Sequence, residues 1–298
     1  MRYSLLLAFL FLFSTVVFGG HVSGRITDMA GKSIEYVNVG VANTTIGVIS
    51  DGKGHFSMHI PDSLSGHEVI FSHISFDALR LPAADLIRRS AAGESIEIRL
   101  PERSVVMPEV VVFSGEAQYK RYGASPGSAL RRVVLTAKPR IHAIAPEELP
   151  VEYRDSLTDQ KFNGEIISPI NIRKPILLRE ISFPVSNMPH DSLLVRLNLY
   201  EKEGGELIPI HREAIYSRIG NTVGKTYYHV DVLNDQIFIV PGTLYVGFEI
   251  VRYYGFKPGK QIVLPFHLGG GYMRNGIDSY GKVPGHSGIQ VYGRILPD

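Results

Sequence analysis

The stretch TTIGVISDGKGHFSMHIP, residues 44–61, decides the fold of the first part of the chain. Its second half, GHFSMHIP, has an apolar residue at every second position, which is the spacing of a β-strand with one buried face. Asp51 and Gly52 precede this run, and an Asp-Gly pair favours a tight turn because glycine accepts positive φ without steric cost. The stretch therefore predicts a turn that leads into a strand.

Two other interpretations of the same stretch fail on its chemistry. A calcium loop needs oxygen ligands at alternating positions and ends in a glutamate, and only Asp51 fits. A phosphate loop needs Gly-Lys followed by Ser or Thr and a helix, whereas Lys53 is followed by Gly54 and a predicted strand. His55 and His59 would lie ~13 Å apart on a strand, too far for one metal ion. We predict no metal and no cofactor.

The composition excludes several classes of protein. The 298 residues carry a formal charge of +2, which argues against nucleic acid as a partner. The chain has no cysteine, so disulfides, thiolate metal sites and a lipid anchor on an N-terminal cysteine are excluded. With 30 glycines, 18 prolines and many short β-branched runs, the sequence predicts an all-β protein of about two sandwich domains.

Residues 1–20, MRYSLLLAFLFLFSTVVFGG, combine an early cation, an apolar run and small residues at the end. This layout is typical of a secretory signal peptide cleaved near Gly19 or Gly20. The alternative is an uncleaved anchor, but the run from Leu5 to Phe13 is shorter than the ~20 residues that span a bilayer. We expect an exported protein, periplasmic or associated with the outer membrane, with no transmembrane segment in the mature chain.

Residues 21–113 contain six or seven short alternating runs, which predict a small β-sandwich. The positions expected to face its core share the period of two. They are Val22, Ile26, Val37, Val39, Val41, Phe56, Met58, Ile60, Ile96, Ile98 and Leu100.

The same region resembles the carboxypeptidase regulatory-like domain, a transthyretin-like (Ig-like) sandwich. Ser33 and Ser50 stand where that family usually has proline and threonine, and VIFSHISFDAL and MPEVVVF resemble its later strands. The resemblance implies a non-catalytic module of the Bacteroidetes envelope type, in which such a domain often precedes a TonB-dependent receptor. The remaining chain is too short for that barrel, so the resemblance does not imply a receptor. The matching positions are Gly24, Asp28, Gly31, Ile34, Val37, Gly47, Asp51, Gly54, Phe56 and Pro61.

Residues 114–160 form a basic, proline-containing linker. Apolar residues between Leu130 and Ala137 recur at helical spacing and predict a short amphipathic helix. Its apolar stripe would pack on a neighbouring domain, or its basic face would contact anionic lipid. Ser156 lies in an Asp-Ser-Leu triplet that resembles the O-glycosylation acceptor of exported Bacteroidetes proteins, so we predict modification there.

Residues 161–298 contain about eight alternating runs and predict a second, jelly-roll-type sandwich. Two loops at its end, around 253–256 and 272–286, bring tyrosines together with amide and carboxylate groups, a combination that suits sugar rings. Structural packing and a protein contact are the alternatives, because tyrosines also anchor sandwich loops. The candidate ligand-binding residues are Tyr253, Tyr254, Tyr272, Arg274, Asn275, Asp278, Tyr280 and His286.

Catalytic motifs are weak. GASPG, residues 123–127, matches G-x-S-x-G, but Pro126 lacks the N–H that the residue after the serine gives to an oxyanion hole. We therefore expect a non-enzymatic binding or accessory module whose partner is an envelope or outer-membrane protein. The second hypothesis is a carbohydrate-binding protein, and the third is a hydrolase whose catalytic residues come together only in the folded chain.

Overall fold

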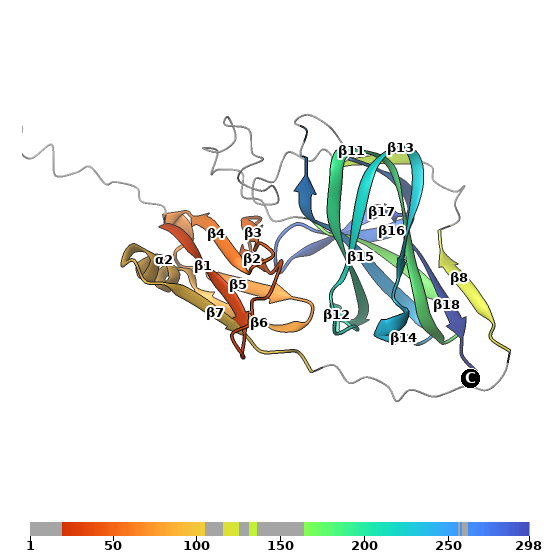
Figure 1. The fold of residues 1–298 in the computed structure, drawn as a ribbon, viewed down its shortest axis with the longest axis horizontal. Coiled ribbons are helices and arrows are strands. Elements are labelled where there is room, and N and C mark those ends of the chain that lie inside the picture. The colour runs from red at the N-terminus through yellow and green to blue at the C-terminus, as the bar shows by residue number, and fades with distance from the viewer. Residues whose placement is uncertain are drawn as a thin grey trace, which may run out of the picture.

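The computed structural model describes residues 20–104, 116–124, 131–135, 164–255, 257 and 262–297. These residues form two β units that lie side by side (Figure 1). Three predictions fall outside the described residues: the signal peptide up to residue 19, the strand in MPEVVVF, and modification at Ser156. The all-β prediction is confirmed.

The N-terminal unit is a sandwich of two sheets. One sheet has the order β4-β1-β7, with β7 parallel to β1, and the other has the order β3-β2-β5-β6. Every core position expected from the period of two is buried between them, because alternate side chains of a strand point to the same face. The strands are β1 (Gly20–Asp28), β2 (Asn38–Val41), β3 (Gly47–Ile49), β4 (His55–Ile60), β5 (Glu68–His73), β6 (Phe76–Pro82) and β7 (Ile96–Leu100).

The turn predicted at Asp51 is confirmed, and it carries the chain from one sheet of the sandwich to the other, since β3 and β4 belong to different sheets. One carboxylate oxygen of Asp51 accepts the backbone N–H groups of Lys53 and His55, each at 2.8 Å. Gly54 has φ +78°, and a Cβ there would overlap the carbonyl oxygen of Ile26. Glycine at this position therefore satisfies both the conformation and the close approach.

A helix that the sequence analysis does not predict, α2 (Ala83–Ala91), follows β6. It buries Ala83 and Leu86, which are three positions apart and so share one face. The helix closes one end of the core against β1. Short 3-10 turns occur at η2 (Asp62–Leu64) and, in the second unit, η6 (Leu233–Asp235).

The C-terminal unit is an eleven-stranded sheet in place of the eight or so strands expected. Its longest strand, β11, pairs with β18 before residue 185 and with β15 after residue 191. Two register shifts lie between these parts, and such bulges let one strand serve two layers. The strands are β8 (Tyr119–Gly123), β9 (Arg131–Leu135), β10 (Ile166–Ile172), β11 (Ile176–Glu203), β12 (Glu206–Pro209), β13 (Ile215–Asp231), β14 (Phe238–Ile239), β15 (Gly242–Tyr254), β16 (Ile262–Arg274), β17 (Tyr280–Ser287) and β18 (Gln290–Ile295).

The predicted helix in the linker is wrong for residues 131–135, which form strand β9 and pair with β16. The segment reads RRVVL, and β-branched valines favour a strand when a neighbouring strand offers a free ladder. Residues 119–123, also assigned to the linker, form β8 and pair with β18. Part of the expected linker therefore belongs to the second unit.

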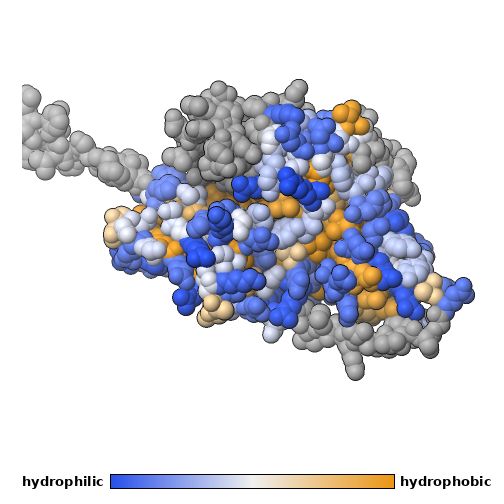
Figure 2. All heavy atoms as spheres, viewed as in Figure 1, coloured by the Kyte–Doolittle hydropathy of each residue, from blue (hydrophilic) through white to orange (hydrophobic). Residues whose placement is uncertain are grey.

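The two units meet along the outer face of the sheet that contains β2 and β5. Val39 and Val41 face the first core, while Asn38 on the opposite face of β2 is also buried. Ile70 of β5 packs with Ile277, which comes from the turn between β16 and β17. Hydrophilic residues cover most of the molecular face in Figure 2, with hydrophobic ones between them near the middle, where the units meet.

Candidate functional site

The segment 272–286 is mostly two strands, although the sequence analysis predicts a loop. β16 and β17 pair antiparallel up to Arg274 and Tyr280, which leaves a short turn at 275–279. The glycines that suggested a loop allow close packing instead. A Cβ at Gly271 would meet the carbonyl oxygen of Gly285 on the neighbouring strand, and a Cβ at Gly285 would overlap the Phe266 ring.

The turn between β16 and β17 binds the N-terminal unit. The backbone N–H of Asn43 donates to both carboxylate oxygens of Asp278, at 3.1 and 3.2 Å. Beside it, Ile277 packs with Ala42 and Ile70. Asp278 thus makes a contact between the two units. The neighbouring candidate, Asn275, lies in the same turn and donates its backbone N–H to Ser279.

Arg274 points to a buried carboxylate, Glu165, just before β10. The carboxylate of Glu165 accepts bonds from Asn198 Nδ2 at 2.7 Å and Tyr200 Oη at 3.0 Å, and Arg274 Nη2 lies 3.3 Å away. Burial raises the pKa of Glu165, and the positive charge of Arg274 opposes that rise. A Cβ at Gly247 would overlap this carboxylate, so the cluster needs glycine there.

An apolar contact from the N-terminal unit covers this cluster. Ile74 is buried with Ile167 and Tyr200 of the second unit, and Tyr245 and Tyr272 pack against the same group. Tyr272, a candidate for sugar binding, therefore belongs in part to the contact between the units.

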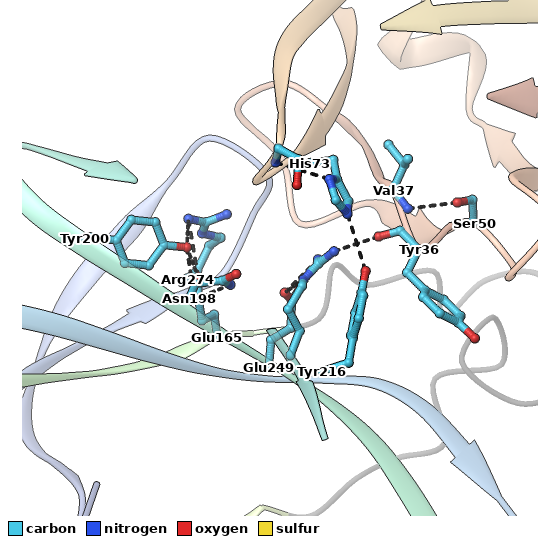
Figure 3. Close-up of polar contacts among 12 residues, drawn as sticks. Tyr36, Val37, Ser50, His73, Glu165, Asn198, Tyr200, Tyr216, Glu249 and Arg274 are labelled. Atoms are coloured by element: carbon cyan, nitrogen blue, oxygen red, sulfur yellow. Dashed lines mark hydrogen bonds and ion pairs between the residues drawn. The ribbon is translucent and has the colours of Figure 1, made fainter. Parts of the chain in front are cut away.

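A second buried ion pair lies beside the first. Arg196 Nε and Nη2 bond to Glu249 Oε2 at 3.0 and 2.8 Å, and both side chains are only 2% exposed. Arg196 Nη1 donates to the carbonyl oxygen of Tyr36 in the other unit at 2.8 Å (Figure 3). Tyr216 completes the group, with its ring edge-on to that of Tyr36. We call Tyr36, His73, Arg196, Tyr216 and Glu249 the domain joint.

His73 joins this group as a neutral imidazole. Its Nδ1 accepts the backbone N–H of Ser75, so its proton lies on Nε2, which donates to Tyr216 Oη at 3.3 Å. Burial, helped by the charge of Arg196, lowers the pKa of His73 to about 3. Nearby, His211 accepts the N–H of Leu199 on Nε2 and donates from Nδ1 to the Glu213 carbonyl. Burial lowers its pKa to about 4.

Tyr272 and Tyr280 do lie together on the surface, with ring centroids 5.8 Å apart. Tyr245 packs edge-on to Tyr272 at the same distance, and Lys202 Nζ donates to Tyr272 Oη at 3.0 Å. That bond is the main reason why the pKa of Tyr272 is lowered. Tyr280 Oη holds the β11–β12 turn through the backbone of 205 and 207. We call Lys202, Tyr245, Tyr272 and Tyr280 the tyrosine cluster.

The other candidates lie elsewhere. Tyr253 is only 2% exposed and packs edge-on against the ring of His190 in the second core. Tyr254 lies under the guanidinium of Arg218, 4.3 Å from its ring centroid. His286 lines a cavity at a different place in the sheet. The structure thus brings together Tyr272 and Tyr280 but does not unite the eight candidates in one site.

The comparison with protein families bears on the N-terminal unit. Residues 22–112 match the model of the CarboxypepD_reg-like domain. The N-terminal unit is a carboxypeptidase regulatory-like domain. The resemblance seen in the sequence is thereby confirmed for this unit, and β1 to β7 are its strands.

Comparisons over the whole chain add little to this assignment. No curated protein matches the chain. Solved structures with some similarity include infectious bursal disease virus, Gt strain (11% identity, TM-score 0.24, 93% of this chain and 60% of that chain) and its VP2 subviral particle (10%, 0.25, 93% and 60%). A third is vicilin from Capsicum annuum (10%, 0.11, 89% and 72%). The chain spans under two thirds of the viral chains, and TM-scores this low carry no argument.

Two buried carboxylates lie near the contact with the regulatory-like domain. Glu165 and Glu249 are two neighbouring carboxylates, a pattern also found in acid–base catalysis, but both are buried, so their partners are protein groups. Within the described ranges, no group of three His, Cys, Asp or Glu residues could hold a metal ion. The helices in the same ranges are all too short or too polar to cross a membrane.

The domain joint is not among the sites predicted from the sequence, although the sequence carries a signal for it. Arg196 and Glu249 are single charges inside the apolar runs LLVRLNLY and VGFEIV, on the face opposite the core residues. A charge between apolar neighbours on a strand indicates either a solvated face or a buried pair. The position of the regulatory-like domain, which the sequence does not reveal, makes these two a buried pair.

Proposed function

We propose that the chain is an exported, non-catalytic binding module of the cell envelope, which presents its two domains as one rigid body to an outer-membrane or surface protein. The observation that carries this proposal is the domain joint. A buried ion pair bonded to the backbone of the opposite domain fixes the angle between the domains, because either charge left alone in the contact would be costly.

Three features support the envelope location and the binding role. Residues 1–20 have the layout of a signal peptide. The regulatory-like domain is a β-sandwich of a family whose members often occur in envelope proteins of the Bacteroidetes type. The joint and the Asp278 contact hold the domains through polar groups, and the Ile74 contact adds an apolar one, which suits a scaffold that binds with its outer surface.

The test is co-purification from gently solubilised envelopes of the native cell, with quantitative mass spectrometry against an untagged control. We expect one outer-membrane or surface protein at a near-equimolar ratio to the tagged chain. Recovery of the chain alone from the envelope fraction contradicts the binding role. Recovery of the chain in the cytosol contradicts the location.

Carbohydrate binding is the second candidate, and the tyrosine cluster is the observation that favours it. Its rings lie at the surface with a lysine and are only partly buried, and aromatic faces beside polar groups bind sugar rings. Glycan arrays with the parent chain and with a Tyr272→Ala, Tyr280→Ala variant test it. Tyr119→Ala, which removes an exposed tyrosine on β8, is the matched control. A parent chain that binds no glycan rules this candidate out.

A further inference from the structure

A cavity of about 530 Å³ lies in the C-terminal domain, away from both the joint and the tyrosine cluster. Four strands contribute to it: β8, β10 and the neighbouring strands β16 and β17. Its volume lies within the range of small-molecule sites, roughly 300–1,000 Å³. The polar residues that line it are Lys120, Arg121, Asn171, Arg173, His267 and His286.

The charged residues that line the cavity are all positive. Three of these residues are permanent cations and two are histidines, and among the described residues no aspartate or glutamate lines the cavity. Lys120 and Arg173 are exposed and come from different strand ends, β8 and the end of β10. Cations on separate walls of one concave site attract an anion from several directions, and this raises both its affinity and its rate of association.

Arg121 is bonded through its guanidinium to residues that do not line the cavity. Its Nη1 donates to Glu180 Oε1 at 2.8 Å and to Ser182 Oγ at 2.9 Å, and its guanidinium lies 5.0 Å from the Tyr292 ring centroid. Glu180, Ser182 and Tyr292 are not among the residues that line the cavity, so the positive charge available to a ligand comes from Lys120 and Arg173.

The two histidines form a fixed wall. His267 and His286 are opposite each other on β16 and β17, and their rings stack with centroids 5.6 Å apart. His286 Nδ1 donates to the carbonyl of Ser287 at 2.8 Å, which sets the orientation of its ring. Because both histidine rings are packed in fixed orientations, the cavity differs from a chance group of surface lysines.

We infer that this cavity binds a phosphate monoester attached to a small polar or lipid group. A phosphate offers three terminal oxygens to cations on several walls, whereas one carboxylate is satisfied by a single bidentate arginine. The volume exceeds that of phosphate alone, and Tyr122, Ile170 and Leu268 line the rest, where they would contact the carbon part of the ligand. This inference goes beyond the proposed protein partner and does not depend on it.

Titration calorimetry on the full mature chain at low salt tests the inference with two sources of phosphate monoester. Glucose 6-phosphate represents a soluble ligand, with glucose as its uncharged control. Vesicles of phosphatidylcholine containing phosphatidic acid represent a lipid headgroup, with pure phosphatidylcholine as control. We expect saturable binding of one of these probes and none of its control. Absence of saturable binding to both, up to about 1 mM, overturns the inference.

Two double variants test whether the ligand binds in this cavity. Lys120→Gln with Arg173→Gln should weaken it by at least ~10-fold, because each removes a charge-assisted bond. Lys53→Gln with Arg99→Gln removes the same charge from the regulatory-like domain and should change affinity less than ~2-fold. Equal effects of the two double variants would mean nonspecific attraction and overturn the inference.

A second pair of variants tests the cavity without removing a cation. Leu268 lines the cavity and is 59% exposed, so it tolerates a polar side chain. Leu268→Glu places a carboxylate in the cavity and should abolish binding, whereas Leu268→Gln has nearly the same size and should retain it. Unchanged affinity in Leu268→Glu argues against this site.

Discussion

Arg196 of the larger domain donates a 2.8 Å hydrogen bond to the backbone carbonyl of Tyr36 in the regulatory-like domain. Tyr36 has φ +54°, a conformation uncommon for a residue other than glycine. The bond therefore ties a charged side chain of one domain to a conformationally special residue of the other. Because Glu249 balances the same guanidinium, the two domains share one buried charge network.

Breaking that network should be costly. Arg196→Met leaves the Glu249 carboxylate buried without its partner, and we expect a loss of about 3–5 kcal/mol in the free energy of unfolding, measured by urea denaturation. Arg196→Met with Glu249→Leu removes both charges and should recover most of that loss. A double variant no more stable than the single one would show that the packing of Arg196, and not its charge, stabilises the joint.

Stability should fall as the pH drops below about 6.5, partly through two histidines. Burial holds the pKa of His73 at about 3 and of His211 at about 4, whereas both titrate near ~6.5 in the unfolded chain. Below pH ~6.5 the unfolded state binds protons that the folded state does not, so stability falls by up to ~1.4 kcal/mol per pH unit for each histidine. The decline ends near pH 4 for His211 and near pH 3 for His73.

The difference between wild type and a His73→Gln, His211→Gln variant isolates this effect, since other groups titrate alike in both. Urea denaturation at pH 7.5, 6 and 5 should give a shallower pH dependence for the variant. Parallel curves for the two proteins would contradict the neutral, buried state of these histidines.

The sequence predicts the strands of the regulatory-like domain well because apolar residues recur at every second position within each strand. Val37, Val39 and Val41 mark one buried face without reference to any other part of the chain. The opposite face of the same strand is buried only because a second domain covers it. Asn38 is a polar residue at such a position, and nothing in its neighbours reveals what packs there.

The candidate site was less predictable for a related reason. Tyr272, Arg274 and Asp278 have the composition of a ligand site, and the same polar and aromatic groups also suit a domain contact. Only the position of Ile74 and Asn43 on the other domain separates the two interpretations. The glycines around 271 and 285 suggested a loop, but they permit two strands to approach closely.

Gly247 should be intolerant of a side chain. A Cβ at this position would overlap the Glu165 carboxylate, which is buried and bonded to Asn198 and Tyr200. We expect Gly247→Ala to lower the free energy of unfolding by about 3 kcal/mol, since the overlap forces a bonded group to move. Gly220→Ala, in β13 with open space around it, is the matched control and should change stability by less than ~1 kcal/mol. Equal effects in urea denaturation would contradict this account of the cluster.

Ile74 should determine whether the two domains unfold together. Ile74→Asp puts a carboxylate among Ile167 and Tyr200, where an unpaired charge is strongly disfavoured, while both domain cores keep their own residues. In calorimetry we expect the wild type to unfold in one transition and the variant in two, because domains without a shared contact unfold separately. Small-angle scattering should show a larger radius of gyration for the variant. Ile208→Asp, at a position 40% exposed on β12, is the control and should behave like the wild type. A single unchanged transition in Ile74→Asp would mean that the contacts of Arg196 and Asp278 hold the domains together without it.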